Sequence, residues 1–131
     1  MAVELSVVVP SVNGLGDLIG CLTALQSQSS DVSLEMVVVD RLGEGVRSEV
    51  SRRFPDARVI AVSPRTTIPQ MRQAAFDAAK GDAVAVIEDH VIVPPGWARA
   101  LLDARRETGA VVGGYRQCGA ILGRRLGGVP L

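Results

Sequence analysis

The sequence has few cysteines, and none in a pattern that binds a metal or builds a scaffold. Its 131 residues include only Cys21 and Cys118, which lie far apart and outside any Cys-x-x-Cys or Cys/His spacing. This spacing argues against a zinc site and against a fold held together by disulfides. It favours a reducing compartment, and we expect the chain to be cytoplasmic.

Net charge and long apolar runs are also lacking. Fourteen basic residues balance fourteen acidic ones, so no overall field attracts nucleic acid or an anionic membrane. The N-terminal stretch MAVELSVVVP carries an acidic residue instead of the basic start of a signal peptide, and its apolar run is too short to span a bilayer. We therefore expect no nucleic-acid partner, no transmembrane segment and, for any charged ligand, a local binding site.

The sequence does contain enough apolar material for one core. Hydrophobic residues make up 47% of the chain and charged residues 21%, which indicates one domain or one part of a larger one. No Gly-x-x-x-x-Gly-Lys-Ser/Thr loop is present, which excludes a P-loop NTPase.

Short valine-rich runs alternate with segments of helical spacing. The runs are almost continuously apolar, which is typical of strands buried on both faces, and they cover residues 5–9, 36–39, 58–62, 83–87 and 110–112. Helices are predicted between them at 15–25, at 44–53, at 67–80 with Pro69 in the first turn and Gly81 as the stop, and after Pro94-Pro95. The alternation predicts an α/β fold with a Rossmann-like open, mostly parallel sheet of about five strands in the order 3-2-1-4, and helices on both faces.

Polar residues follow three of the predicted strands, at the point where each strand ends. They are Pro10-Ser11-Val12-Asn13-Gly14, Asp40-Arg41 and Glu88-Asp89-His90. Ligands of open α/β sheets bind beyond the carboxyl ends of the strands, where the strand order reverses. Carboxylates with a histidine can hold a divalent cation, and a cation can hold a diphosphate. A nucleotide with a metal is therefore the natural candidate ligand.

Four further stretches follow one another along the chain: LSVVVPSVNGLGDLIGCLTALQSQ, EMVVVDRLGEG, IPQMRQAAFDAAKG and DAVAVIEDHVIVPPGWARALL. In order and spacing they resemble the family 2 glycosyltransferases of the GT-A fold. They parallel that family's first strand and turn, its Asp-ended second strand, its arginine helix, and its Asp-x-Asp strand end with the following Pro-x-Trp-Leu helix start. The agreement in order and spacing covers roughly residues 4–113. The resemblance implies a protein that binds a nucleoside-diphosphate sugar, with a divalent metal, for transfer of the sugar to an acceptor hydroxyl.

The resemblance also implies roles for individual residues. Metal binding, by Mn²⁺ or Mg²⁺, falls on Asp89 and His90, and nucleotide binding falls on Pro10, Ser11, Asn13, Asp40, Arg72 and Glu88. His90 stands where the family has a carboxylate. Because imidazole suits softer transition metals better than Mg²⁺, the substitution favours manganese or no metal.

The acceptor half of the family has no counterpart in this sequence. The chain ends in VVGGYRQCGAILGRRLGGVPL, which contains no carboxylate that could act as the general base. We therefore expect a nucleotide-sugar-binding half-domain at residues 1–114 and the start of a missing acceptor half at 115–131. Loss of proton transfer typically costs ~10²- to 10⁴-fold in rate, so turnover by this chain alone is expected to be weak or absent.

Each of these residues also has a structural interpretation. The acidic cluster at 88–90 could be a solvated strand exit, Asp40 could cap a turn, and Arg72 could be a surface charge. Ser11 and Asn13 could cap the first helix. Cys21 is expected in the core, and Trp97 is expected to pack its helix onto the sheet.

Two other functions stay open. The Gly14-Leu15-Gly16 stretch and Asp40 weakly resemble a dinucleotide-binding pattern, although the third glycine, Gly20, is one position late. The missing acceptor half is also compatible with a non-catalytic remnant or interaction module, whose exposed sheet edge would promote self-association.

Overall fold

Strands and helices alternate along the chain in the computed structural model, which describes residues 2–108, 115–116 and 119–120. The main elements are β1 (Leu5–Ser11), α1 (Leu15–Gln26), β2 (Leu34–Asp40), α2 (Glu44–Arg53), β3 (Arg58–Ala61), α3 (Ile68–Ala78), β4 (Ala83–Val86) and α4 (Trp97–Thr108). A short 3₁₀ helix, η1 (Ser27–Ser30), follows α1, and β5 (Tyr115–Arg116) pairs antiparallel with β6 (Gly119–Ala120). None of the described helices is long and apolar enough to cross a membrane.

The first four strands form one parallel sheet in the order β3-β2-β1-β4. This confirms the predicted α/β class, the parallel sheet and its strand order. The sheet has four strands in the described part of the chain, one fewer than predicted, and the predicted fifth strand at 110–112 lies outside the described residues. Because β1 lies between β2 and β4, the strand order reverses between β1 and β4.

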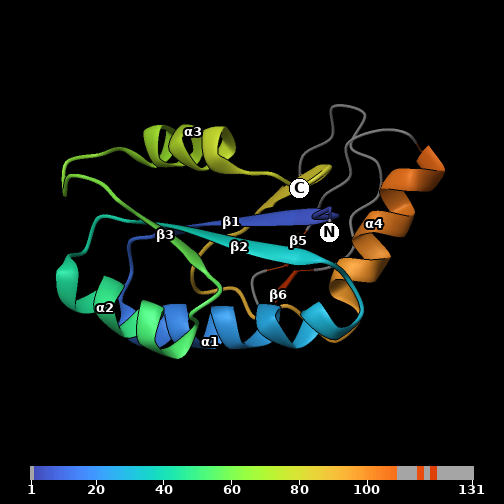
Figure 1. Cartoon of the computed structure of the whole chain (residues 1–131), viewed down its shortest axis with the longest axis horizontal. Helices are drawn as coiled ribbons and strands as arrows, with labels where there is room; N and C mark the ends of the chain where they lie inside the picture. The colour runs from blue at the N-terminus through green and yellow to red at the C-terminus, as the bar shows by residue number, and fades with distance from the viewer. Residues whose placement is uncertain (1, 109–114, 117–118, 121–131) are drawn as a thin grey trace.

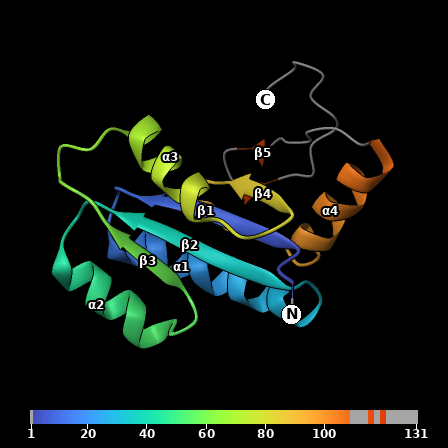
Figure 2. The same ribbon diagram turned by 45° about the horizontal axis from the view of Figure 1, so that its top comes forward.

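Helices cover both faces of the sheet, with α3 on one face and α1 and α2 on the other (Figure 1). Alternate residues of β1 serve the two layers: Val7 and Val9 belong to the core under α1, whereas Val8 packs with Met71 and Ala75 of α3. Burial on both faces explains why the strands are almost continuously apolar. The helix α4 lies beside the β4 end of the sheet (Figure 2).

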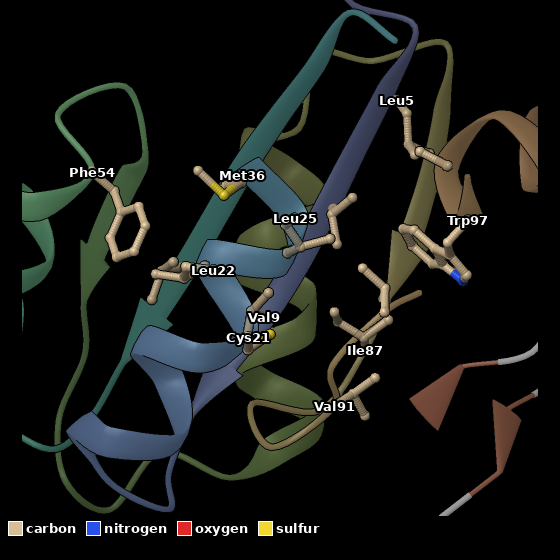
Figure 3. Close-up of a cluster of buried hydrophobic side chains, with 14 of the residues drawn as sticks. Leu5, Val9, Cys21, Leu22, Leu25, Met36, Phe54, Ile87, Val91 and Trp97 are labelled. Carbon is tan, nitrogen blue, oxygen red and sulfur yellow. The ribbon is translucent and has the colours of Figure 1, made fainter. Parts of the chain in front are cut away.

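The larger core contains the side chains that fasten α1 and α4 to the sheet. Cys21 lies beside Val9 on the inner face of α1, and Trp97 extends from the start of α4 toward Leu5 and Ile87 (Figure 3). Both predictions, a core cysteine and a packing tryptophan, are confirmed. Burial, with a smaller contribution from the nearby Asp89 charge, raises the pKa of the Cys21 thiol to about 12.

The helix α3 begins as its sequence predicts. Thr67 and Gln70 form a capping box, and Pro69 sits in the first turn. The helix ends at Ala78, before the predicted stop at Gly81. Gly81 is needed instead for a close approach, because a Cβ atom there would lie 2.6 Å from the backbone nitrogen of Ser6.

Candidate functional site

The carboxyl ends of β1, β2 and β4 are joined by side-chain hydrogen bonds. Ser11 Oγ donates to Asp40 Oδ1 over 2.7 Å, which links the end of β1 to the end of β2. Asn13 Nδ2 donates to Asp89 Oδ1 over 2.6 Å, which links the loop after β1 to the segment after β4. Three strand ends that are distant in sequence therefore meet at one edge of the sheet, next to the point where the strand order reverses.

Asp40 is buried and holds the turn that leads into α2. Besides the bond from Ser11, its Oδ2 accepts the backbone N–H of Gly43 over 3.0 Å and Nη1 of Arg47 over 3.1 Å. The bond from Gly43 agrees with the interpretation of Asp40 as a residue that caps the turn. Sequence reasoning missed Arg47. The helix α2 begins at Glu44, and its first turn places the guanidinium of Arg47 next to the Asp40 carboxylate.

Asp89 is 1% exposed, and its carboxylate anchors the loop after β1. Its Oδ2 accepts the backbone N–H groups of Val12 and Asn13, both over 2.8 Å, and its Oδ1 accepts the Asn13 amide. The two carboxylate oxygens thus accept three hydrogen bonds between them. The direction of this side chain could have been read from the sequence, because Asp89 is in phase with the apolar residues of an alternating segment, Ile87, Val91 and Val93, all of which are buried.

Glu88 and His90 point the other way. Their side chains are 48% and 40% exposed, and Nε2 of His90 lies 3.7 Å from Oε1 of Glu88. The other ring nitrogen, Nδ1, lies 3.4 Å from the amide nitrogen of Asn13. The three ionisable residues after β4 therefore divide into one buried carboxylate and two outward-facing side chains.

The predicted metal ligands, Asp89 and His90, do not form a fitting donor set. Asp89 already satisfies three hydrogen-bond donors, and Nδ1 of His90 faces an amide N–H₂ group. Within the described residues, no group of three or more His, Cys, Asp or Glu side chains is arranged to hold a metal ion. A hard divalent cation at a nucleotide site is usually held by one or two carboxylates together with phosphate oxygens and water, and the carboxylate of Asp89 is already engaged by its three donors.

Arg72 stands apart from the hydrogen-bonded group. It lies on α3 and is half-buried, and its Nε is buried without a hydrogen-bond partner in the described part of the chain. No ion pair or hydrogen bond joins it to Asp40 or Asp89 within those residues. A buried donor without an acceptor costs folding free energy, which makes Arg72 the one described arginine with an unmet demand for an acceptor.

The remaining predicted residues belong to β1 and the loop after it. Pro10 is buried in β1 and pairs with Val39 of β2. The N-cap of α1 is Gly14, with no side-chain capping bond, so the interpretation of Ser11 and Asn13 as helix caps is wrong. Their side chains are used by the two aspartates instead.

The same loop bears on the dinucleotide alternative. Dinucleotide-binding folds present the backbone N–H groups of the first strand-to-helix turn to a pyrophosphate. Here the backbone N–H groups of Val12 and Asn13 are taken by the carboxylate of Asp89. These N–H groups are therefore not available to a pyrophosphate, so the structure disfavours an NAD-type mode of binding.

Comparisons with known proteins agree on family and fold. The family model described as glycosyl transferase family 2 matches residues 6–125. No curated protein matches the chain. Among solved structures, residues 1–349 of S. aureus TarS superpose with a TM-score of 0.70 at 20% identity, and the superposition covers 82% of this chain and 33% of that one.

Two further structures give the same result. The mannosyltransferase PcManGT from Pyrobaculum calidifontis, solved with GDP-Man and Mn²⁺, matches with a TM-score of 0.62 at 23% identity, covering 87% of this chain and 34% of that one. A longer S. aureus TarS structure matches with a TM-score of 0.70 at 20% identity, over 83% of this chain and 20% of its own length. At these identities the likeness shows the fold, and this chain spans a third or less of each neighbour.

Proposed function

The chain belongs to glycosyl transferase family 2, and from that membership we propose that its strand-end site binds a nucleoside-diphosphate sugar for transfer of the sugar to an acceptor hydroxyl. The observation that carries the proposal is the meeting of Ser11, Asn13, Asp40 and Asp89 at the carboxyl edge of the sheet. That edge is where open α/β sheets bind their ligands.

The side chains of the site divide into a buried base and an exposed rim. Ser11 and Asp40 are buried and bonded to each other, so they support the loop after β1 under the nucleoside. Asn13, Glu88 and His90 are exposed and are the groups that a ligand would meet. Hydroxyl groups of a ribose or a sugar suit the carboxylate of Glu88, which accepts hydrogen bonds.

Arg72 supplies the positive charge in this proposal. Its buried Nε has no partner among the described residues, and a guanidinium group recognises phosphate oxygens well. Phosphate oxygens of a bound diphosphate would therefore supply the acceptor that the guanidinium of Arg72 lacks among the described residues.

Transfer of the sugar is a separate matter from binding. The chain spans 33% of the TarS fragment and 34% of the mannosyltransferase. We propose that the general base belongs to an acceptor half beyond this chain, and that residues 1–114 bind the nucleotide sugar with little or no turnover. The alternative of a non-catalytic interaction module predicts the same fold without nucleotide binding.

Calorimetric titration with UDP and GDP, each with and without Mn²⁺, separates these possibilities. We expect at least one nucleotide to bind, and His90→Ala to weaken binding about 10- to 100-fold, the value of one hydrogen bond with a charged partner. The matched control is Asp82→Asn, which removes an exposed carboxylate beside β4 at the opposite edge and should leave binding unchanged. Absence of binding under every condition would contradict the proposal and favour the interaction module.

The free edge of the sheet suggests self-association with a second copy of the chain. β4 is an edge strand in the described sheet, and its Val84 and Val86 side chains are 39% and 36% exposed. Val86 pairs with Val8, whose side chain packs under α3. The apolar sheet face that α3 covers at β1 therefore extends to β4, where Val86 is partly exposed. Unpaired edges with apolar side chains favour strand pairing between copies.

Sedimentation velocity over a range of concentrations tests this association. We expect a dimer that Val86→Lys converts to a monomer, because a lysine on an edge strand opposes pairing. Leu42→Lys, at a side chain that is 40% exposed in the loop after β2 and away from that edge, is the control and should leave the dimer intact. A wild-type chain that is monomeric at every concentration would contradict the association and leave the nucleotide-binding proposal untouched.

A further inference from the structure

We propose that His90 serves this site as a hydrogen-bond donor, through Nε2, to a phosphate oxygen of the nucleotide, and not as a metal ligand. The choice of ligand rests on the function proposed above. The state of the ring rests on an independent observation, a chain of contacts from Asp89 through Asn13 to His90, here called the Asp89 relay.

The first step of the Asp89 relay fixes the amide of Asn13. Asp89 is 1% exposed, and two backbone N–H groups hold its Oδ2, so the carboxylate cannot turn. Its Oδ1 lies 2.6 Å from the terminal amide of Asn13. Because an ionised carboxylate only accepts hydrogen bonds, the amide atom facing it must be the NH₂ group.

The second step fixes the ring of His90. The same amide nitrogen lies 3.4 Å from Nδ1 of His90. An NH₂ group has two hydrogens, and since one is directed to Asp89 the other is available to Nδ1. A donor facing Nδ1 makes that nitrogen the acceptor, so the proton of the neutral ring lies on Nε2.

This arrangement is the reverse of what a metal-binding histidine needs. A ring that ligates a metal through one nitrogen normally donates the N–H of the other to a carboxylate or a carbonyl. Here Nδ1 lies 3.4 Å from the donor nitrogen of Asn13 and 4.0 Å from Oδ1 of Asp89, which is beyond hydrogen-bond length. The closer contact of Nδ1 is thus with a donor, and Nε2 carries the proton in place of a free lone pair. The ring is 40% exposed and its Nε2 lies 3.7 Å from Glu88, beyond hydrogen-bond length. Nε2 is therefore able to donate to an anionic oxygen that enters from solvent.

The state of the ring can be measured without any ligand. His90 is the only histidine in the chain, so a long-range ¹⁵N–¹H spectrum of the imidazole reports on this residue alone. We expect Nε2 protonated and Nδ1 bare in the wild type, and a loss of this preference in Asn13→Ala, which removes the donor. A wild-type ring protonated on Nδ1, or a ring unaffected by Asn13→Ala, would overturn the relay.

Three substitutions of His90 test its role with UDP and GDP, each titrated in EDTA and in Mn²⁺. His90→Gln keeps an N–H donor near the place of Nε2, His90→Ala removes it, and His90→Asp sets a second carboxylate beside Glu88. We expect wild-type affinities in EDTA and in Mn²⁺ to agree within about threefold, and His90→Ala to lose about 10- to 100-fold. His90→Gln should recover most of that loss, and His90→Asp should recover it only with Mn²⁺, because carboxylates suit hard cations.

The outcomes separate the two proposals. Wild-type binding that requires Mn²⁺, or a His90→Gln variant that binds no better than His90→Ala, would overturn the donor role while leaving the nucleotide site intact. Absence of nucleotide binding in every condition would overturn the proposed function and the ligand assigned to His90. The ring spectrum would still decide whether the Asp89 relay orients the imidazole.

Discussion

At the amino edge of the sheet the carboxylate of Glu35 is largely buried and its oxygens are engaged by neighbouring residues, whereas at the carboxyl edge two buried carboxylates lie beside polar side chains that face outward. Oε2 of Glu35, at the amino edge, accepts from Ser6 Oγ and from the backbone N–H of Lys80, both over 2.6 Å, and Oε1 lies 3.7 Å from Arg58. These contacts join β1, β2, β3 and the end of α3.

The carboxyl edge uses Asp40 and Asp89 in a similar way, but polar side chains there also face outward. Glu88 and His90 are exposed beside Asp89, and the Nε of Arg72 lacks a partner among the described residues. Saturated carboxylates therefore stabilise the structure at both edges, and the proposed site lies at only one of them. Four substitutions test this difference, in order of expected effect.

The largest effect is expected at the amino edge, from Gly81→Ala. The added Cβ would lie 2.6 Å from the backbone nitrogen of Ser6 and 2.9 Å from the carbonyl oxygen of Ala83, neither of which can move aside easily. We expect a loss of about 3 kcal/mol in the free energy of unfolding, the upper part of the range for overpacking. Urea denaturation followed by circular dichroism measures it.

Gly45→Ala is the matched control for this substitution. Gly45 lies in α2, and a Cβ atom there would meet nothing within 4 Å. The better helix propensity of alanine should raise stability by about 0.5 kcal/mol. Equal effects of the two substitutions would show that the amino edge is not closely packed at Gly81.

Asp40→Asn should have the next largest effect, and it should act on both stability and binding. An amide cannot accept from Ser11, Gly43 and Arg47 together, and it leaves the guanidinium of Arg47 without its charged partner. We expect a loss of about 2 kcal/mol in stability, reduced from the value of a fully buried pair because Arg47 is partly exposed. Nucleotide titration should show a parallel loss of affinity, and an unchanged affinity would remove Asp40 from the site.

Glu35→Gln should lower stability without altering binding. The amide oxygen can take the place of Oε2, which serves both Ser6 and Lys80, but the side chain loses its charge and its NH₂ group then faces Arg58 in place of Oε1, so a loss of about 1 kcal/mol is expected in urea denaturation. UDP and GDP should bind as they do to the wild type, because Glu35 lies at the opposite edge. A change in nucleotide affinity would break the division between the two edges.

The smallest effect is expected from Glu49→Gln on the surface of α2, outside both edges. Hydrogen bonds from Arg52, and then from Arg53, lower the pKa of Glu49 to about 2. A carboxylate with a lowered pKa in the folded state stabilises it above the unfolded pKa, and that contribution is lost as the pH falls from about 4.5 toward 2.

Thermal melts of the wild type and of Glu49→Gln between pH 2 and pH 6 test this point. Because the arginine partners of Glu49 are exposed on the surface, solvent and salt screen its ion pairs, so the difference should be slight at pH 6, absent near pH 2 and removed by high salt. A large difference at pH 6 would show that a solvent-facing carboxylate matters as much as an enclosed one.

The fold could be predicted almost completely from the sequence. Valine runs buried on both faces and capped helices between them specify alternating strands and helices, and Thr67 with Pro69 sets the start of α3. The helix end at Ala78 was less predictable, because Gly81 serves a close approach to β1 that depends on tertiary contact.

The meeting of the candidate residues at one edge could be predicted, but not the direction of their side chains. The strand ends at Ser11, Asp40 and Asp89 are read from the chain, and parallel pairing brings them to one edge. Whether a carboxylate faces the ligand or the protein depends on partners elsewhere in the sequence, such as Arg47 for Asp40. The tautomer of His90 depends in turn on Asn13, 77 positions away, and no local pattern encodes that contact.

The bonds from Val12 and Asn13 to Asp89 span 77 and 76 positions of the chain. During synthesis, β1, β2 and α1 can assemble while the loop after β1 still lacks its anchor, because the carboxylate that orders it has not yet left the ribosome. The carboxyl edge of the sheet is therefore completed late, and chains that stop before Asp89 would expose an unfinished loop even if their first three strands had paired.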